Sequence, residues 1–231
     1  MKAPGLRHFV AALAVLLGVW AGARMYLDHV VPKNAGVAVP AGVASAPDPG
    51  DGVLADAPLP RPVVPVELPD FALNDLSNKP ISVSVWRGRS LVINFWATWC
   101  APCRHEVPLL KALATEWAGR GLTVVGIAVD YKDKVQQFAD QFKIDYPLLI
   151  GEQDALDVAA KFGMPSPAFP FTVFTDRRGR VVALFVGELH KPQVDFILSV
   201  VENLNRDKEQ LPEARRRIAA GLEALAENQA G

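Results

Sequence analysis

The stretch that decides the fold reads Leu91-Val92-Ile93-Asn94-Phe95-Trp96-Ala97-Thr98-Trp99-Cys100-Ala101-Pro102-Cys103, and it holds the only two cysteines among 231 residues. Residues 91–96 form an apolar run that is typical of a buried strand, and the residues from Cys100 to about Trp117 are predicted to form a helix. A helix N-terminus stabilises an anion, and a cysteine thiolate is an anion. The sequence therefore predicts thiol chemistry at the point where the strand is followed by the helix.

The spacing of the two cysteines favours a reversible disulfide. The pair is too close to staple distant parts of a fold, and the four histidines supply no second paired cluster for zinc. Cys100 is the predicted attacking thiol, because the first turn of a helix lowers a thiol pKa. Cys103 is the predicted resolving thiol, which attacks the mixed disulfide. The alternative is an inert disulfide or two buried thiols. We expect no metal, and no cofactor other than a redox-active Cys100–Cys103 disulfide.

Three neighbours of the cysteines are candidate site residues. Pro102 suits the first turn of a helix, and Trp99 is a candidate for a flat apolar docking surface. Glu106 follows Cys103 by three residues and so lies on nearly the same helix face. A buried carboxylate there would have a raised pKa and could accept the proton that Cys103 must lose. An ordinary solvated glutamate is the open alternative, and His105 is expected on the exposed side.

The order of the predicted elements indicates an α/β fold with a mixed sheet and helices on both faces. Asp154 is expected to cap the helix that ends before Gly163, and Asp176 to Gly179 is expected to form a hairpin turn. Strands are predicted at 71–73, 81–85, 91–96, 122–129, 147–150, 171–175 and 181–186, and helices at 100–117, around 135–142, at 154–162 and at 192–204.

The ends of the chain differ in composition from this domain. Residues 1–31 contain basic residues followed by an apolar stretch at 9–23, which indicates either a cleaved signal peptide or a retained membrane anchor. Residues 32–65 are rich in Pro, Ala and Gly and are predicted to be a linker. The domain is expected at 66–205. The charged tail at 206–231 is expected to be a short amphipathic helix that is mostly solvated, with a docking surface as the alternative.

The segment from Asn94 to Pro108 resembles the active-site segment of the TlpA/ResA-like exported thiol–disulfide oxidoreductases, which have the thioredoxin fold. The resemblance covers about Val66 to Leu204 and implies a three-layer sandwich with an N-terminal β-hairpin extension. It implies that Cys100 is the nucleophile, that Cys103 resolves and that Glu106 tunes the pair. It also implies a cis-proline, best matched by Pro170, beside which the bulky Phe169 departs from the family pattern at the predicted substrate-binding surface.

The resemblance implies a reductase of exported protein disulfides, for example those of apocytochrome c or copper-site assembly proteins. It further implies a membrane thiol electron donor and a periplasmic location, with residues 9–31 as the tether to the inner membrane. A cleaved form is the alternative. Other possible functions are a copper chaperone, because Cu(I) prefers thiolates, and a thiol peroxidase. The net charge of −1 and pI near 6.4 argue against nucleic acid as a partner, and a monomer is expected.

Overall fold

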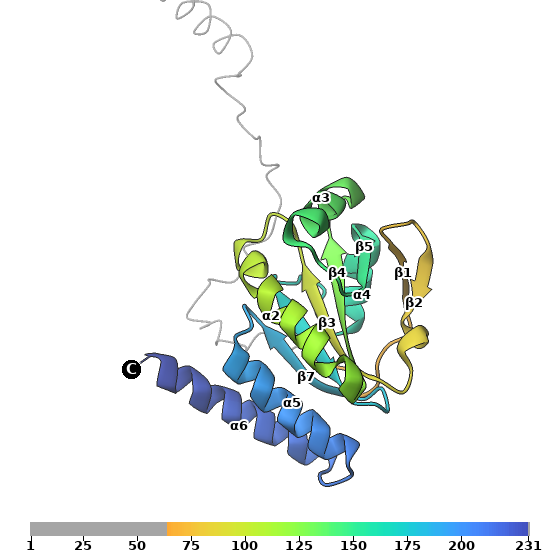
Figure 1. Cartoon of the computed structure of the whole chain (residues 1–231). Helices are drawn as coiled ribbons and strands as arrows, with labels where there is room; N and C mark the ends of the chain where they lie inside the picture. The colour runs from red at the N-terminus through yellow and green to blue at the C-terminus, as the bar shows by residue number, and fades with distance from the viewer. Residues whose placement is uncertain (1–63, 231) are drawn as a thin grey trace, which may run out of the picture. The chain divides into compact units, whose positions relative to one another are not determined.

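The computed structural model describes residues 64–230, so the predicted export segment and nearly all of the predicted linker lie outside the described residues. The described chain forms a seven-stranded mixed sheet in the order β2-β1-β5-β4-β3-β6-β7 (Figure 1). The strands are β1 (Ala72–Asp75), β2 (Pro80–Ser82), β3 (Ser90–Trp96), β4 (Leu122–Val129), β5 (Leu148–Gly151), β6 (Phe171–Thr175) and β7 (Val181–Val186). The predicted α/β class is confirmed.

The centre of the sheet explains why β3 and β4 read as continuous apolar runs. β3 pairs in parallel with β4 and antiparallel with β6, and β4 pairs in parallel with β5. All seven residues of β3 are buried, as expected for a strand that is covered on both faces. The helices are α2 (Ala101–Trp117), α3 (Lys132–Phe142), α4 (Gln153–Lys161), α5 (Lys191–Asn205) and α6 (Leu211–Ala230).

Two hydrophobic cores lie on opposite faces of the sheet. Helices α2 and α3 follow consecutive right-handed crossovers that step in the same direction across the sheet, so both cover the same face. Their buried side chains share one core with those of α5 and α6. The other core contains α4 and the buried Val83. The prediction of helices on both faces is therefore confirmed.

Two local predictions were wrong: the strand at 81–85 and the capping role of Asp154. The predicted strand 81–85 ends at Ser82, and Val83–Trp86 forms a 3-10 helix. The Ser82 hydroxyl accepts the N–H of Ser84, which turns the chain out of the sheet while Val83 stays buried. At α4 the N-cap is Glu152, and Asp154 lies inside the first turn. Its carboxylate there favours the helix through the dipole, without capping it.

The C-terminal helix is packed onto the domain, so the expectation of a mostly solvated tail was wrong. Leu211, Ala214 and Ile218 of α6 are buried in the same core as α5. Gly221 permits a close approach, because a Cβ built there would lie 2.2 Å from the Phe196 ring of α5. Most charged side chains of α6 lie on its exposed side. α6 is therefore an added layer over α5.

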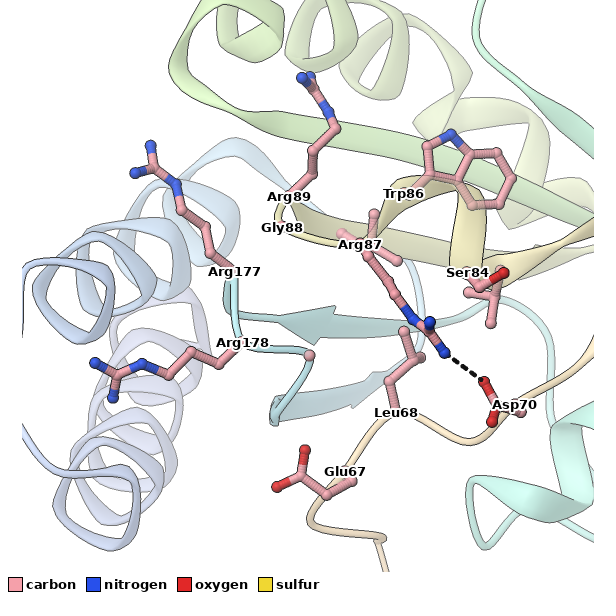
Figure 2. Close-up of a pocket in the computed structure, with 13 residues that line it drawn as sticks. Glu67, Leu68, Asp70, Ser84, Trp86, Arg87, Gly88, Arg89, Arg177 and Arg178 are labelled. Carbon is pink, nitrogen blue, oxygen red and sulfur yellow. Dashed lines mark ion pairs between the residues drawn. The ribbon is translucent and has the colours of Figure 1, made fainter.

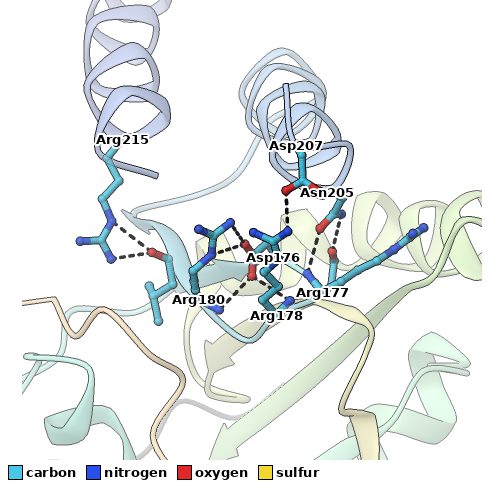
Figure 3. A network of polar contacts seen from close by, with 9 residues as sticks. Asp176, Arg177, Arg178, Arg180, Asn205, Asp207 and Arg215 are labelled. Atoms are coloured by element: carbon cyan, nitrogen blue, oxygen red, sulfur yellow. Dashed lines mark hydrogen bonds and ion pairs between the residues drawn. The ribbon is translucent and has the colours of Figure 1, made fainter. Parts of the chain in front are cut away.

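A polar network ties α5 and α6 to the β6–β7 hairpin (Figure 3). The carboxylate of buried Asp176 accepts the backbone N–H of Arg180 at 2.9 Å and its guanidinium Nε at 2.7 Å. Asn205, the last residue of α5, accepts the N–H of Arg177 in the same turn. Arg215 of α6 donates to the carbonyl of Val181 at the start of β7. These bonds satisfy groups at the sheet edge that would otherwise be unpaired.

Candidate active site

Cys100 and Cys103 form a disulfide at the N-terminus of α2, with their Cα atoms 5.3 Å apart. Cys100 is the N-cap residue, and its Sγ accepts the backbone N–H of Cys103 at 3.3 Å. Cys100 is 5% exposed and Cys103 1% exposed. The first turn of α2 therefore places a donor and the positive end of the helix dipole at the sulfur that would become a thiolate on reduction.

Two aromatic side chains, Trp99 and Phe169, meet near the N-terminus of α2. Trp99 is 67% exposed, and its ring lies edge-on to that of Phe169 with 6.0 Å between centroids. The Phe169–Pro170 peptide bond is cis, and Pro170 directly precedes β6. Pro102 lies in the first turn of α2, where its missing N–H leaves no hydrogen bond unmade. The structure thus brings Phe169, from the segment before β6, against Trp99 and against the core that contains both cysteines.

Glu106 is buried on α2, about one helical turn after Cys103. The residue is 1% exposed. Its carboxylate accepts the side-chain N–H of Asn94 at 2.7 Å on Oε1 and the backbone N–H of Leu189 at 3.1 Å on Oε2. Burial raises the pKa of Glu106 from 4.5 to about 7, although the two hydrogen bonds act to lower it. A group with this pKa can accept and release a proton near neutral pH.

Two further titratable groups interact with Glu106, but only one of them changes its pKa. Glu188 lies in the loop between β7 and α5, and its negative charge adds to the increase in the Glu106 pKa. Tyr146 is buried, and its pKa is raised by burial and by the charge of Glu106. His105 is exposed, as predicted, and its Nδ1 lies 3.3 Å from a carboxylate oxygen of Glu188.

Asn94 and Asp130 also contact this site, although neither was predicted from the sequence as a site residue. Asp130 directly follows β4, and one carboxylate oxygen accepts both the N–H and the hydroxyl of Thr98, while the other accepts the N–H of Tyr131 at 2.8 Å. β3 and β4 are parallel neighbours, so their carboxyl ends meet at the same edge of the sheet. The signals that could have found these residues were a polar side chain inside an apolar strand and an acid directly after one.

The described residues also contain a cavity of about 370 Å³ away from the disulfide (Figure 2). Its lining includes Arg87, Arg89, Arg177 and Arg178, and none of the residues around Cys100. Arg89 donates to backbone carbonyls of the α2–β4 connection, and Arg178 pairs with Asp207. Figure 2 shows the guanidinium groups of Arg89, Arg177 and Arg178 pointing away from one another. The arginines thus tie loops together and do not converge on a ligand.

The part of the chain that the structure describes contains neither a cluster of metal-ligating side chains nor a helix suited to cross a membrane. Among residues 64–230, no group of three or more His, Cys, Asp or Glu side chains is placed to hold a metal ion. The use of no metal and no separate cofactor stays a prediction from the sequence. Within the same range, none of the helices has the length and apolar character that a membrane crossing requires.

Comparisons with known proteins agree with this fold and site. The AhpC/TSA family matches residues 64–184, just over half of the chain. The thiol-disulfide oxidoreductase ResA of Geobacillus kaustophilus is 31% identical over 135 residues, which cover 58% of this chain and 75% of that protein. The thioredoxin-like protein YneN of Bacillus subtilis is 33% identical over 133 residues, which cover 56% of this chain and 75% of that protein.

Solved structures of thiol–disulfide exchange proteins have similar folds. A thiol:disulfide interchange protein of Chlorobium tepidum is 29% identical with a TM-score of 0.54, and the match covers 59% of this chain and 96% of that one. A secreted thiol-disulfide isomerase of Corynebacterium glutamicum is 31% identical with a TM-score of 0.54, and the match covers 58% of this chain and 85% of that one. The chain therefore belongs to the AhpC/TSA family of thioredoxin-fold proteins, and within it to the thiol–disulfide oxidoreductases.

Proposed function

We propose that the protein reduces disulfides of exported proteins through the dithiol form of Cys100 and Cys103. The observation that carries this proposal is the buried Glu106. Its side chain follows Cys103 by one turn of α2, and its pKa is raised to about 7. A buried resolving thiol reacts slowly while it is protonated, because the thiolate is the nucleophile. A nearby carboxylate that is ionised near neutral pH can take that proton.

The reaction consists of two exchange steps. The Cys100 thiolate attacks one sulfur of the substrate disulfide, which forms a mixed disulfide and releases the other substrate sulfur as a thiolate that takes up a proton. Cys103 then gives its proton to the Glu106 carboxylate and attacks Sγ of Cys100. The second substrate sulfur leaves as a thiolate and is protonated, and the Cys100–Cys103 disulfide forms. Two electrons pass from the protein to its substrate, and a dithiol donor must return them.

The exposed Trp99 and the half-buried Phe169 are the proposed docking surface for the substrate. Trp99 directly precedes Cys100, and Phe169 packs edge-on to Trp99 and against the core that contains both cysteines. An aromatic surface of this kind offers much apolar contact area with little loss of side-chain entropy. A substrate polypeptide would place its cysteine between Trp99 and Pro170. The bulk of Phe169 would favour partners with small or flexible residues beside that cysteine.

The location and the partners form part of the same proposal. The basic and apolar pattern of residues 1–31 supports export, with residues 9–31 as a tether to the cytoplasmic membrane. Apocytochrome c and copper-site assembly proteins are the proposed substrates, and a membrane dithiol protein is the proposed electron donor. A related structure described as that of a secreted thiol-disulfide isomerase supports an extracytoplasmic site of action.

Trapping the mixed disulfide tests this function. The Cys103→Ser variant of the full chain is expressed in a bacterium with an intact export pathway. It should accumulate mixed disulfides through Cys100 that dithiothreitol cleaves. The matched control is the double variant Cys100→Ser/Cys103→Ser, which should capture nothing. Adducts with exported proteins that carry disulfides support the proposal. If the single variant captures no exported protein, or consumes peroxide rapidly instead, the proposal is wrong.

A further inference from the structure

Asn94 is a polar residue in the otherwise apolar centre of β3. It is 1% exposed, and a buried amide without partners costs several kcal/mol. Its Nδ2 donates at 2.7 Å to Oε1 of Glu106 and at 3.0 Å to Oγ1 of Thr172. Both partners are buried. The amide therefore donates both of its hydrogens, one to a residue of α2 and one to a residue of β6.

The two oxygens of Glu106 are held by different elements. Asn94 from β3 binds Oε1, and the backbone N–H of Leu189 from the loop after β7 binds Oε2. Donors aimed at both oxygens favour the ionised form, which accepts hydrogen bonds only. Burial acts in the opposite direction. The Leu189 donor is part of the backbone, so Asn94 is the side chain on which this balance depends.

The other charged and titratable groups around Glu106 do not replace Asn94. Glu188, from the β7–α5 loop, opposes ionisation of Glu106. Tyr146, which precedes β5, is buried and has a raised pKa, so it is neutral at physiological pH. Cys100 and Cys103 lie on α2 itself, and the exposed His105 is directed to Glu188. The hydrogen bond from Asn94 is therefore the side-chain contact that favours the Glu106 carboxylate.

Asn94 also links this carboxylate to the wall of the substrate site. Asn94 and Thr172 are direct partners in the β3–β6 register, and Thr172 follows Pro170 by two residues. The contact with Thr172 fixes the amide so that its second hydrogen points at Glu106. The proton acceptor beneath Cys103 and the strand behind Pro170 are thus held by one side chain.

We propose that Asn94 is a positioning residue for the resolving step, because its amide holds the Glu106 carboxylate ionised and in place to receive the proton of Cys103. This inference rests on the proposed function, in which Glu106 is the proton acceptor. Asn94 itself touches neither substrate nor sulfur. Its effect should therefore be visible as a change in the pH at which the reaction accelerates.

The experiment measures the pH dependence of reduction of a model disulfide protein such as insulin by the fully reduced protein, in single turnovers from pH 5 to 9. Asn94→Leu keeps the side-chain shape and removes the donor. It should move the midpoint that depends on Glu106 upward by about one pH unit, since a hydrogen bond to a charged group has about this value. The rate at pH 7 should then fall roughly fivefold, because the ionised fraction of Glu106 falls from about one half to about one tenth.

Two further variants separate positioning from a general loss of stability. Thr172→Val keeps the Asn94 donor to Glu106 and removes only the contact that orients it, so it should shift the midpoint by less than half as much. Glu106→Gln should remove this midpoint, and adding Asn94→Leu to it should leave the pH profile unchanged. If Asn94→Leu leaves the midpoint where it is in an active enzyme, the inference is wrong. A wild-type protein that does not reduce the disulfide, or a midpoint that survives Glu106→Gln, would instead contradict the proposed function.

Discussion

The buried carboxyl of Glu106 predicts an unusual pH dependence of stability for the oxidised protein. Its pKa is 4.5 in an unfolded chain and about 7 in the fold. Between these values the folded state binds a proton that the unfolded state does not, so the free energy of unfolding decreases as the pH rises. The shift of about 2.5 units corresponds to roughly 3 kcal/mol, lost between about pH 4.5 and pH 7. Below pH 4.5 both states are protonated and Glu106 carries no such cost.

The perturbation that isolates this effect is Glu106→Gln. Glutamine has almost the same shape and no titration, so any loss of hydrogen bonding to Asn94 or Leu189 is a constant offset with pH. The difference between the free energies of unfolding of the variant and the wild type should grow by roughly 3 kcal/mol in favour of the variant from pH 4.5 to above pH 7. Urea denaturation at half-unit pH intervals measures it, with the Cys100–Cys103 disulfide intact so that neither thiol titrates.

The shape of that difference curve tests whether Glu106 is desolvated in the folded protein. A difference that is flat to within about 1 kcal/mol over this range, or that changes in the opposite direction, would show that Glu106 is not held in a desolvated site. A second variant tests the cause of the shift. Glu188→Gln removes a like charge near Glu106, so the upper end of the change should move to lower pH, and an unchanged curve would exclude that charge as a contributor.

Three further predictions concern other parts of the molecule. Trp99→Ala, at a side chain that is 67% exposed, should leave the thermal midpoint unchanged but lower mixed-disulfide capture by Cys103→Ser about tenfold; equal capture would remove Trp99 from the docking surface. Asp130→Ala deprives Thr98 of its acceptor and should cost roughly 2–3 kcal/mol in urea denaturation, whereas a loss below about 0.5 kcal/mol would mean that water replaces the carboxylate. Ile218→Ala, at a position that is 4% exposed, should lower the unfolding free energy by about 2 kcal/mol, and an unchanged value would show that α6 is not part of the cooperative unit.

Much of the fold could be predicted from local sequence. The predicted strands 122–129, 171–175 and 181–186 agree with β4, β6 and β7 to the residue, because buried strands and hairpin turns leave strong local patterns. The strand at 81–85 failed because one hydroxyl, that of Ser82, redirects the chain. α6 could be predicted as a helix but not as part of the core, because a weak apolar face says nothing about whether a partner surface exists.

The sequence by itself predicted thiol–disulfide exchange, because a CxxC pair at the start of a helix favours a reversible disulfide wherever that helix lies. It also nominated Glu106 by spacing, but left a buried base and a solvated carboxylate as equal choices. Only the tertiary structure showed that the carboxylate is buried and not solvated. The pKa of Glu106 depends on burial and on donors from β3 and from the loop after β7, and those segments lie 12 and 83 residues away along the chain. Desolvation and hydrogen bonding are properties of the assembled site, and no local pattern encodes them.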